Sequence, residues 1–413
     1  MNKKKLIVPL VLLLVTAVYF VFFDKDKKLK YIPENADVVA LIDVKKLTGQ
    51  YISSLILHPS RWGGGGPKDR KRESFKNSGV KIPDFLQVFH IKNTNFSEWY
   101  SVLELKDREK FIAFLKKQKF VSKGKYFFQK GQLYIAVKDN HCIAGTSDYV
   151  FGAAGDRFIQ SSGKNNFTAD QFIHNTSGSI SFIRGNKIQN FSVELNENDI
   201  QIKNNEAPDP GRSIISKLKQ RSCLLELELD AENIRRCSVF FNKKALDSIS
   251  EISSLSIAAD IEQVNDTIIS YGYDDNFNEI EKKTYQKIIQ PNYIIELQSL
   301  SPDKTLEYFQ FRKWVNGQNQ FTAIPFLPNT IIKDNKGIVI HSTRKPVYPP
   351  SKLNENYIFI RNNPLLLSSL KTLSDTEKRI LSEVDYIFYE SKDQHFWMTI
   401  KAKDEKIPLI LRW

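Results

Sequence analysis

The sequence is poor in the residues and motifs that most often carry chemistry. It holds three cysteines and six histidines in 413 residues. No G-x-S-x-G elbow occurs, and "TSGSIS" around Ser179 is typical of the start of a strand, so a serine hydrolase is unsupported unless distant residues assemble its triad. The histidines form no H-E-x-x-H or comparable metal pair, and a structural role is expected for each of them: His58, His90, His141, His174, His341 and His395.

Cysteine is too scarce for a disulfide framework. An odd number of thiols allows at most one internal bridge, and Cys142, Cys223 and Cys237 all lie beside β-branched or aromatic residues. Small buried thiols are therefore expected rather than a redox pair or a metal site. If the chain is exported, Cys223 with Cys237 is the one pairing worth testing.

Long apolar runs are also missing, with one exception near the N-terminus. Leu6 to Phe23 is uninterrupted, follows the basic stretch "MNKKK" and ends in aromatic residues, which is typical of a single membrane span. No A-x-A site ends the run and no cysteine follows it, so it indicates an uncleaved signal anchor. The short basic N-terminus favours an inner-membrane protein with a cytoplasmic N-terminus and a periplasmic main domain. The composition, rich in Asn, Lys and Ile, resembles that of an AT-rich bacterium.

Acidic residues are in the minority. Sixty Lys and Arg against 47 Asp and Glu give a formal charge of +13, which favours an anionic partner without specifying its class. The lysines are scattered along the chain, so no nucleic-acid partner is expected.

A repeated pattern is present instead, in which a β-like run leads through a polar residue into a helix. The junctions at Asp43, Asp107, Ser301 and Asn363 are predicted helix N-caps, and a fifth unit lies around Asp230. Hairpin turns are predicted at these further positions: Lys130–Gly131, Asp139–Asn140, near Asn196, near Asn265, and Asn335 to Gly337.

Together these patterns predict an α+β fold made of repeated strand–helix units with antiparallel meanders, arranged as two similar lobes after one transmembrane helix. The last residues, "IPLILRW", are expected to form a strand after a terminal hairpin. Prolines and a glycine in Asn204 to Ser213 indicate a boundary. The predicted parts are an anchor over 1–30, a first lobe over 31–205 and a second lobe over 206–413.

The lines "YIPENADVVALIDVKKL", "SGVKIPDFLQVFHIK" and "WYSVLELKDREKF" resemble a group of uncharacterised Bacteroidota envelope proteins that carry a lipid or helix anchor. These proteins open with an IP-x-x-A-x-V-V-x-x-I-D line. The resemblance covers about 150 residues after the anchor and implies an exported envelope protein. It carries over no catalytic residue, and this chain lacks the cysteine of the lipidated members.

Two segments suggest ligands without completing a motif. The glycine-rich stretch "RWGGGGPKDRKR" departs from a phosphate-binding loop because Lys68 follows Pro67 and Asp69 follows the lysine. A mobile basic loop is expected there, with Arg70, Lys71 and Arg72 as a candidate electrostatic contact.

The second segment is "DDNFNEIEKKTY", where Asp274, Asn276 and Asn278 occupy the first, third and fifth positions of a calcium loop. The sixth position is Glu279 instead of glycine, and the twelfth is Tyr285 instead of glutamate. A turn rich in Asp and Asn that caps a helix explains the same residues without an ion. No metal or cofactor is expected.

The function predicted from the sequence is a membrane-tethered, noncatalytic scaffold or binding module of the cell envelope. Its expected partners are the membrane, through Leu6 to Phe23, and a protein or glycan of the envelope. The alternative is an envelope hydrolase with a site assembled from distant residues.

Overall fold

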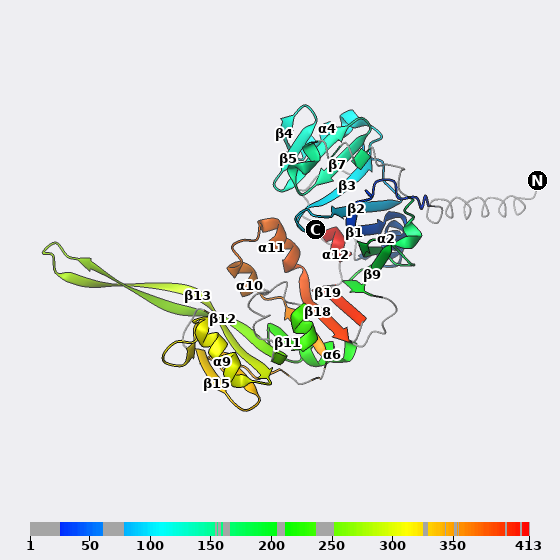
Figure 1. Ribbon diagram of the computed structural model, residues 1–413. Helices are drawn as coiled ribbons and strands as arrows, with labels where there is room; N and C mark the ends of the chain where they lie inside the picture. The colour runs from blue at the N-terminus through cyan, green and yellow to red at the C-terminus, as the bar shows by residue number, and fades with distance from the viewer. Residues whose placement is uncertain are drawn as a thin grey trace, which may run out of the picture. The chain divides into compact units, whose positions relative to one another are not determined.

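The protein consists of two compact units in a computed structural model, which describes residues 25–60, 78–152, 155, 158–159, 166–204, 211–236, 252–324, 329–342, 344–350, 353, 355–392, 395–404 and 407–412 (Figure 1). Unit 1 spans Met1–Asn205 together with Glu405–Ile410, and unit 2 spans Glu206–Asp404 together with Leu411–Trp413. The division between unit 1 and unit 2 at Asn205 and Glu206 therefore falls within the predicted boundary, Asn204 to Ser213.

Unit 1 is built on one antiparallel sheet with the strand order β10-β9-β8-β1-β2-β3-β7-β6-β5-β4. Its strands are β1 (Ala36–Asp43), β2 (Phe85–Ile91), β3 (Trp99–Glu104), β4 (Val121–Gly124), β5 (Phe127–Lys130), β6 (Leu133–Lys138), β7 (His141–Gly145), β8 (Gly178–Arg184), β9 (Lys187–Leu195) and β10 (Asp199–Lys203). Its helices include α2 (Val44–Leu57) and α4 (Arg108–Lys117), with short 3-10 turns η2 (Asp148–Phe151) and η3 (Ala169–Gln171).

The core of unit 1 follows from the alternation of apolar residues along these strands. Val39 and Leu41 of β1 are fully buried, and they join Phe89 and Tyr100 in one apolar cluster. A second cluster forms where Phe111 and Leu115 of α4 pack with Phe128 and Ile135 of the sheet. Both clusters remove large apolar side chains from water, which is the main force holding a sheet to its covering segments.

The strands of unit 2 are also antiparallel and follow the order β14-β15-β16-β13-β12-β11-β17-β18-β19. Its strands are β11 (Leu225–Asp230), β12 (Ile252–Tyr273), β13 (Glu279–Ser299), β14 (Gln320–Phe321), β15 (Asn329–Lys333), β16 (Gly337–Ser342), β17 (Asn356–Arg361), β18 (Val384–Lys392) and β19 (His395–Ala402). The helices in this half of the chain are α6 (Gly211–Lys219), α7 (Ala231–Arg236), α9 (Pro302–Phe311), α10 (Pro364–Ser369), α11 (Asp375–Ser382) and α12 (Leu409–Arg412).

The two units share a connectivity. In each, a central strand (β1 or β11) leads into a helix (α2 or α7), then a hairpin (β2–β3 or β12–β13), then a second helix (α4 or α9). In each, a later strand then pairs with the outer hairpin strand, as β7 does with β3 and β16 does with β13. A further strand, β8 or β17, closes on the free side of the central strand. The repeat of the sequence pattern therefore corresponds to a repeat of topology.

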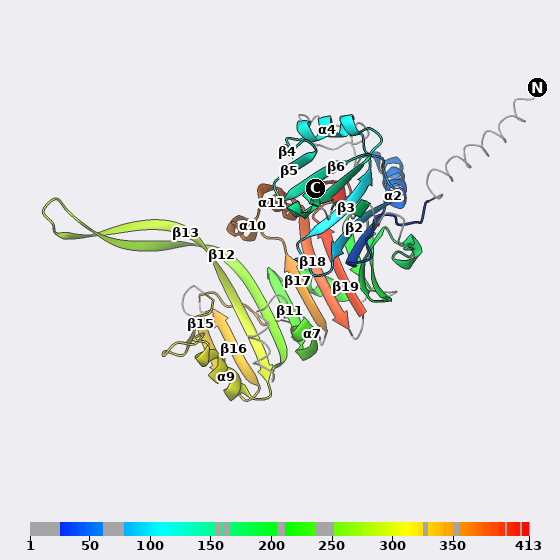
Figure 2. The same ribbon diagram turned by 45° about the horizontal axis from the view of Figure 1, so that its top comes forward.

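One element has no counterpart of equal size. The hairpin of unit 1 has strands of 7 and 6 residues, whereas β12 and β13 have 22 and 21. We call residues 265–287, where this hairpin runs on as two strands alone, the arm (Figure 2).

The predicted fold class is wrong in its balance of elements. Strand accounts for 47% and helix for 22% of the structure, so the fold is β-rich rather than α+β. Each strand–helix junction is visible locally, but most of the helices are short, while antiparallel strands far apart in sequence join into extended sheets.

The predicted transmembrane anchor must also be corrected. Among the helices formed by the described residues, none is long and apolar enough to cross a bilayer. Leu6 to Phe23, on which the expectation rested, lies outside those residues. The prediction of a single-pass inner-membrane protein with a periplasmic domain is accordingly not retained.

Three predicted N-caps are confirmed. Asp43, Asp107 and Asn363 each accept a hydrogen bond from a backbone N–H in the first turn of α2, α4 and α10. Ser301 precedes α9 as predicted, but its side chain makes no capping hydrogen bond.

Two local predictions are wrong. Asn265 pairs with Lys287 inside the long hairpin, and the turn lies at Asp274 to Asn278 instead. The stretch "IPLILRW" contains the short helix α12 rather than a strand. In the first case, the polar residues of the arm resemble those of a turn. A two-stranded ribbon has no buried face, so its strands need no alternation of apolar and polar residues.

Candidate functional site

The residues predicted as an electrostatic contact cannot be placed. Arg70, Lys71 and Arg72, together with the preceding glycines, lie outside the residues that the structure describes. The contact therefore remains a prediction.

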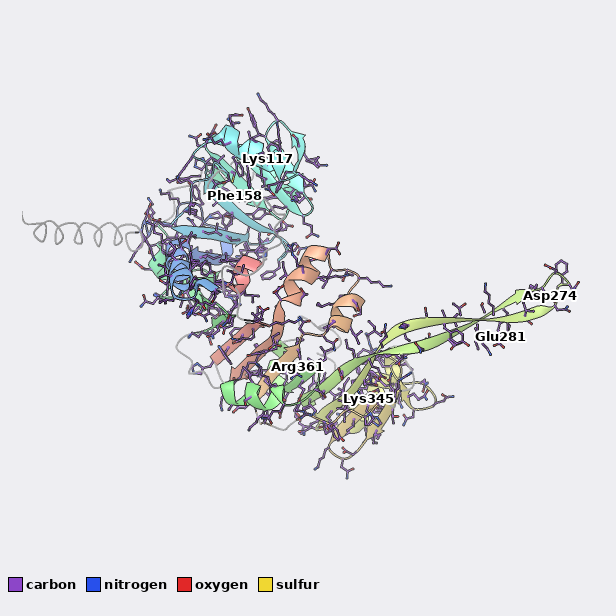
Figure 3. All side chains as sticks on the ribbon, turned by 180° about the vertical axis from the view of Figure 1, so that it is seen from behind. Lys117, Phe158, Asp274, Glu281, Lys345 and Arg361 are labelled. Carbon is purple, nitrogen blue, oxygen red and sulfur yellow. The ribbon has the colours of Figure 1, made fainter. Side chains whose placement is uncertain are left out.

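The predicted calcium loop forms the turn at the tip of the arm (Figure 3). Asp274 Oδ1 accepts hydrogen bonds from the backbone N–H groups of Asn276 (2.9 Å) and Asn278 (2.8 Å), and its Oδ2 accepts one from Asn278 Nδ2 (3.1 Å). These bonds from Asn278 and Asn276 hold the pKa of Asp274 below its usual value. Asp274 thus closes a hairpin turn, and the segment that follows is a strand rather than the helix of a calcium loop.

The thiols and the one deeply buried histidine of unit 1 have structural surroundings. His90 is 3% exposed; its Nδ1 lies 2.6 Å from an Asp37 carboxylate oxygen and its Nε2 lies 3.0 Å from the Asn95 carbonyl oxygen. Cys142 is a free buried thiol, and burial raises its pKa to about 12. Cys223 is free as well, while Cys237 lies outside the described residues. No cluster of metal-ligating side chains occurs in the described chain.

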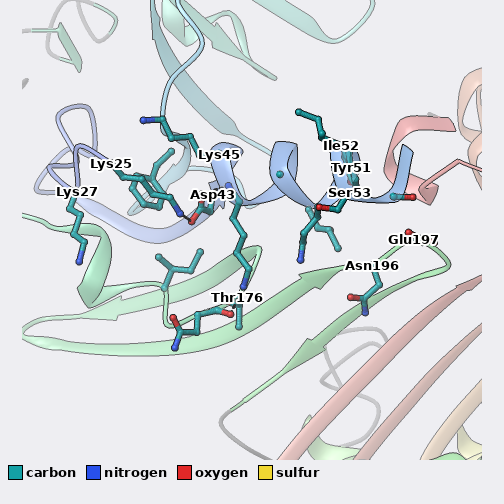
Figure 4. A pocket seen from close by; sticks show the side chains of 18 of the residues that line it. Lys25, Lys27, Asp43, Lys45, Tyr51, Ile52, Ser53, Thr176, Asn196 and Glu197 are labelled. Carbon is teal, nitrogen blue, oxygen red and sulfur yellow. Dashed lines mark hydrogen bonds and ion pairs between the residues drawn. The ribbon is translucent and has the colours of Figure 1, made fainter. Parts of the chain in front are cut away.

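A cleft of about 950 Å³ runs along helix α2 in unit 1 (Figure 4). One wall is α2 itself, and the rest comes from the segment before β1, the start of β2, the loop that leads into β8 and the turn between β9 and β10. These segments are separated in the sequence, and only the fold brings them together. We call this feature the α2 cleft.

Four lysines lie at the N-terminal end of the α2 cleft. Three of them face carboxylates: Lys25 forms an ion pair with Asp43, Lys27 with Asp170 at 3.0 Å, and Lys45 with Asp84 at 3.0 Å. Lys46 differs, because its ammonium donates a hydrogen bond to the uncharged carbonyl oxygen of Asn175.

Asp43 organises this end of the cleft. It is 5% exposed, caps α2 by accepting the Lys46 backbone N–H at 2.8 Å, and also receives the Lys25 ammonium. A carboxylate at a helix N-terminus is stabilised by the helix dipole and by the N–H groups that lack a partner in the helix. The position of the lysines therefore depends on where β1 ends and α2 begins.

Buried Phe85, Ile173 and Leu195 line the cleft, with Phe85 at its basic end, where the Lys25 ammonium lies 5.8 Å from the ring centroid. At the other end, Asn196 and Glu197 lie opposite the later turns of α2. The apolar end of α2 borders the cleft there through Ile52 and Leu57. These last two side chains are 41% and 71% exposed, and Ile56 beside them is also 71% exposed. Among the described residues of α2 only Ser54 is buried, so the last turns of the helix present apolar surface to water. Exposed apolar side chains grouped beside a cleft are the kind of surface that interaction sites use.

The polar side chains in and behind the α2 cleft are engaged in structural hydrogen bonds. No histidine or cysteine is present in its described lining, and Thr176 donates its hydroxyl to the Gly178 carbonyl at 2.8 Å. Ser177 is fully buried behind the cleft and donates to Gln50 Oε1 at 3.1 Å. Burial raises the pKa of the Tyr51 phenol, which makes it a poorer source of a phenolate. Of these residues, Thr176, Ser177 and Tyr51 are not placed as an activated nucleophile beside a general base, the arrangement that a serine-type hydrolase uses.

The α2 cleft was not predicted from the sequence. Apolar residues at 52, 55 and 56 have the spacing of one helix face, which is normally buried, so the sequence does not show that this face is exposed. The lysines gave no signal either, because only the fold brings Lys25 and Lys27 next to Lys45 and Lys46.

Comparison with known proteins finds no matching family, curated protein or solved structure. The resemblance to Bacteroidota envelope proteins therefore remains a prediction.

Proposed function

We propose that the protein is a noncatalytic binding module whose first unit holds an amphipathic ligand, an apolar chain that ends in one anionic group, in the α2 cleft. The observation that carries this proposal is the polarity of the cleft, which has lysine ammonium groups at one end of α2 and exposed Ile52 and Leu57 at the other.

The size of the cleft suits such a ligand. Its volume of about 950 Å³ is at the upper end of the range of roughly 300–1,000 Å³ that is typical of small-molecule sites. At 1.5 Å per residue, Leu57 lies about 16 Å along the helix axis from Lys46. A chain of that length reaches from the basic end to the apolar end.

The charges favour an anionic group over a cationic one. Three of the four lysines are balanced by carboxylates, and Lys46 is left with a neutral oxygen as its partner. An anionic group that reached Lys46 would replace the neutral carbonyl partner of the ammonium by an oppositely charged one, which adds a Coulombic attraction to the hydrogen bond. The general excess of basic residues acts in the same direction at long range.

Titration of the full-length chain with dodecanoate, followed by calorimetry, tests this proposal. We expect saturable binding that weakens about tenfold, or on the order of 1.4 kcal/mol, in Lys46→Gln. Ile52→Asp is expected to abolish binding, because it places a carboxylate where the apolar chain of the ligand lies. Leu133→Asp is the matched control, since Leu133 is 40% exposed but lies on β6, away from the cleft. Binding that is absent in the wild type, or equally weakened by both aspartate variants, would contradict the proposal.

A further inference from the structure

The arm departs from the physical rule that exposed two-stranded ribbons are avoided. β11 pairs with β12 only up to Ala259, and β16 pairs with β13 only from Ile294, so within the described chain the arm has no third strand. An isolated two-stranded hairpin is marginally stable in water, and both of its edges offer unpaired backbone groups. A segment of this length therefore calls for a partner that covers it.

The side chains of the arm are those of an interaction surface. Directly opposed residues share a face, so the pairings Thr267 with Tyr285, Ile269 with Lys283, Tyr271 with Glu281 and Tyr273 with Glu279 define one face, which we call the tyrosine face. Tyr271, Tyr273 and Tyr285 are 68%, 72% and 73% exposed, and Ile269 is 50% exposed. Tyrosine is enriched at protein interfaces because it offers a large apolar ring and a polar tip at a small cost in conformational entropy.

The charges on the tyrosine face are complementary to themselves. Glu281 and Lys283 lie two residues apart on β13 and form an ion pair of 3.0 Å, in which their side chains are 42% and 54% exposed. If a second arm packs on this face in the antiparallel direction, with the two-fold axis between these two residues, Glu281 of each copy meets Lys283 of the other. The same symmetry places Tyr271 of each copy against Ile269 of the other.

We propose that the arm is a self-association surface, on which two copies of the chain pack through their tyrosine faces about a two-fold axis and exchange Glu281–Lys283 ion pairs. A two-fold contact uses the same patch on both copies, so it requires the self-complementarity that these residues have. The proposal is independent of the ligand of the α2 cleft, because the arm belongs to unit 2.

Charge reversal tests the proposal through co-purification of two differently tagged full-length chains. Glu281→Lys alone gives two lysines on each arm, and Lys283→Glu alone gives two glutamates, so each variant is expected to associate with itself at least tenfold more weakly than the wild type. Mixed together, the two variants again place opposite charges in register, and association is expected to return. The double variant that carries both reversals in one chain should self-associate like the wild type.

Lys282→Glu is the matched control. Lys282 lies between the two test residues but pairs with Ser270 on the other face, so it changes the net charge equally while leaving the tyrosine face intact. We expect its self-association to equal that of the wild type. Circular dichroism of each variant checks that unit 2 keeps its sheet.

Several outcomes would overturn the proposal. A wild-type chain that stays monomeric up to high micromolar concentration would do so, as would single reversals that associate normally. A mixture of the two variants that associates no better than either alone would exclude pairing in this register. Loss of association in Lys282→Glu as large as in Lys283→Glu would show that net charge, not the tyrosine face, is responsible.

Discussion

At the residue scale, Asp43 and Asp107 both cap a helix and pair with a lysine, but in different surroundings. Asp43 is 5% exposed and receives an ammonium from outside α2, that of Lys25, whereas Asp107 is solvated and pairs with Lys110 in the first turn of its own helix, α4. We expect Asp107→Ala to lower the stability modestly, because the cap of α4 is lost. Asp43→Ala should cost more, because it also leaves the Lys25 ammonium unpaired in the cleft. Asp43→Asn should fall between the two, since the amide oxygen keeps the cap. Urea unfolding of the three variants measures the order, and equal costs for both alanine variants would contradict it.

Glu226 predicts a pH dependence at the same scale. It is 1% exposed, and burial raises its pKa above the ordinary 4.5 even though Arg221 Nε lies 3.1 Å away. A carboxyl whose pKa is higher in the folded state contributes most below the unfolded pKa, and this contribution is lost as the pH rises through the folded pKa. Relative to Glu226→Gln, the wild type should therefore gain stability as the pH falls from about 7 toward 4.5. Urea unfolding of both proteins across this range checks the sign. A wild type that loses stability relative to Glu226→Gln as the pH falls would contradict the prediction.

What could be read from the sequence at this scale was local. The caps at Asp43, Asp107 and Asn363 follow from a polar residue at a strand–helix junction, which needs no knowledge of distant segments. The α2 cleft could not be read in this way. Its lysines come from two segments separated by β1, and Asp170 and Asn175 come from more than 100 residues further on.

At the element scale, the arm shows where pattern reasoning fails. The paired strands run far past the sheet, and beyond Val264 the residues are mostly exposed, so the alternation that identifies a strand disappears. The turn was placed near Asn265 because polar residues begin there, whereas Asp274 closes it nine residues later. Phe277 has a left-handed φ of 62° in that turn, and its side chain is 87% exposed. A bulky residue in that conformation is unfavourable, and turn chemistry would choose glycine or asparagine there.

Removing the arm tests its independence from the sheet. Replacing Asn265 to Lys287 by an Asn-Gly turn leaves Val264 opposite Ile288, a geometry that a two-residue hairpin loop accepts. Few buried side chains are lost, so the stability of unit 2 should change by less than about 1 kcal/mol. Thermal unfolding followed by circular dichroism measures this change. A large fall in the midpoint would mean that the arm packs on another part of the protein.

At the scale of the whole molecule, the repeated connectivity explains why the sequence pattern recurs and why the predicted fold class was still wrong. In the sequence, each strand–helix unit counts as one strand and one helix, so the repeat predicts an α+β fold. The pairing of β1 with β8, or of β11 with β17, joins residues more than 100 positions apart, and no local pattern records it. Such pairings extend the sheets until strand exceeds helix by 47% to 22%.

The C-terminal segment gives a prediction at this scale. Residues Glu405–Ile410 belong to unit 1 although the preceding strands belong to unit 2, and Leu409 is fully buried. Leu409→Ala should therefore destabilise unit 1 by about 2–5 kcal/mol, the usual cost of such a cavity. Hydrogen exchange should accelerate in β1 and β8, whereas β12 and β17 should keep their protection. Leu133→Ala, at a half-exposed position of β6, is the control. Faster exchange in unit 2 alone would contradict the assignment of this segment.

The central claim is that the α2 cleft selects an apolar chain with an anionic end, and head-group discrimination tests it most directly. Dodecanoate and dodecyltrimethylammonium share a chain and differ in the sign of their charge. The account predicts that the full-length protein binds dodecanoate at least tenfold more tightly, and that most of this preference disappears in Lys46→Gln. Equal affinity for the two ligands, or a preference for the cation, would contradict it.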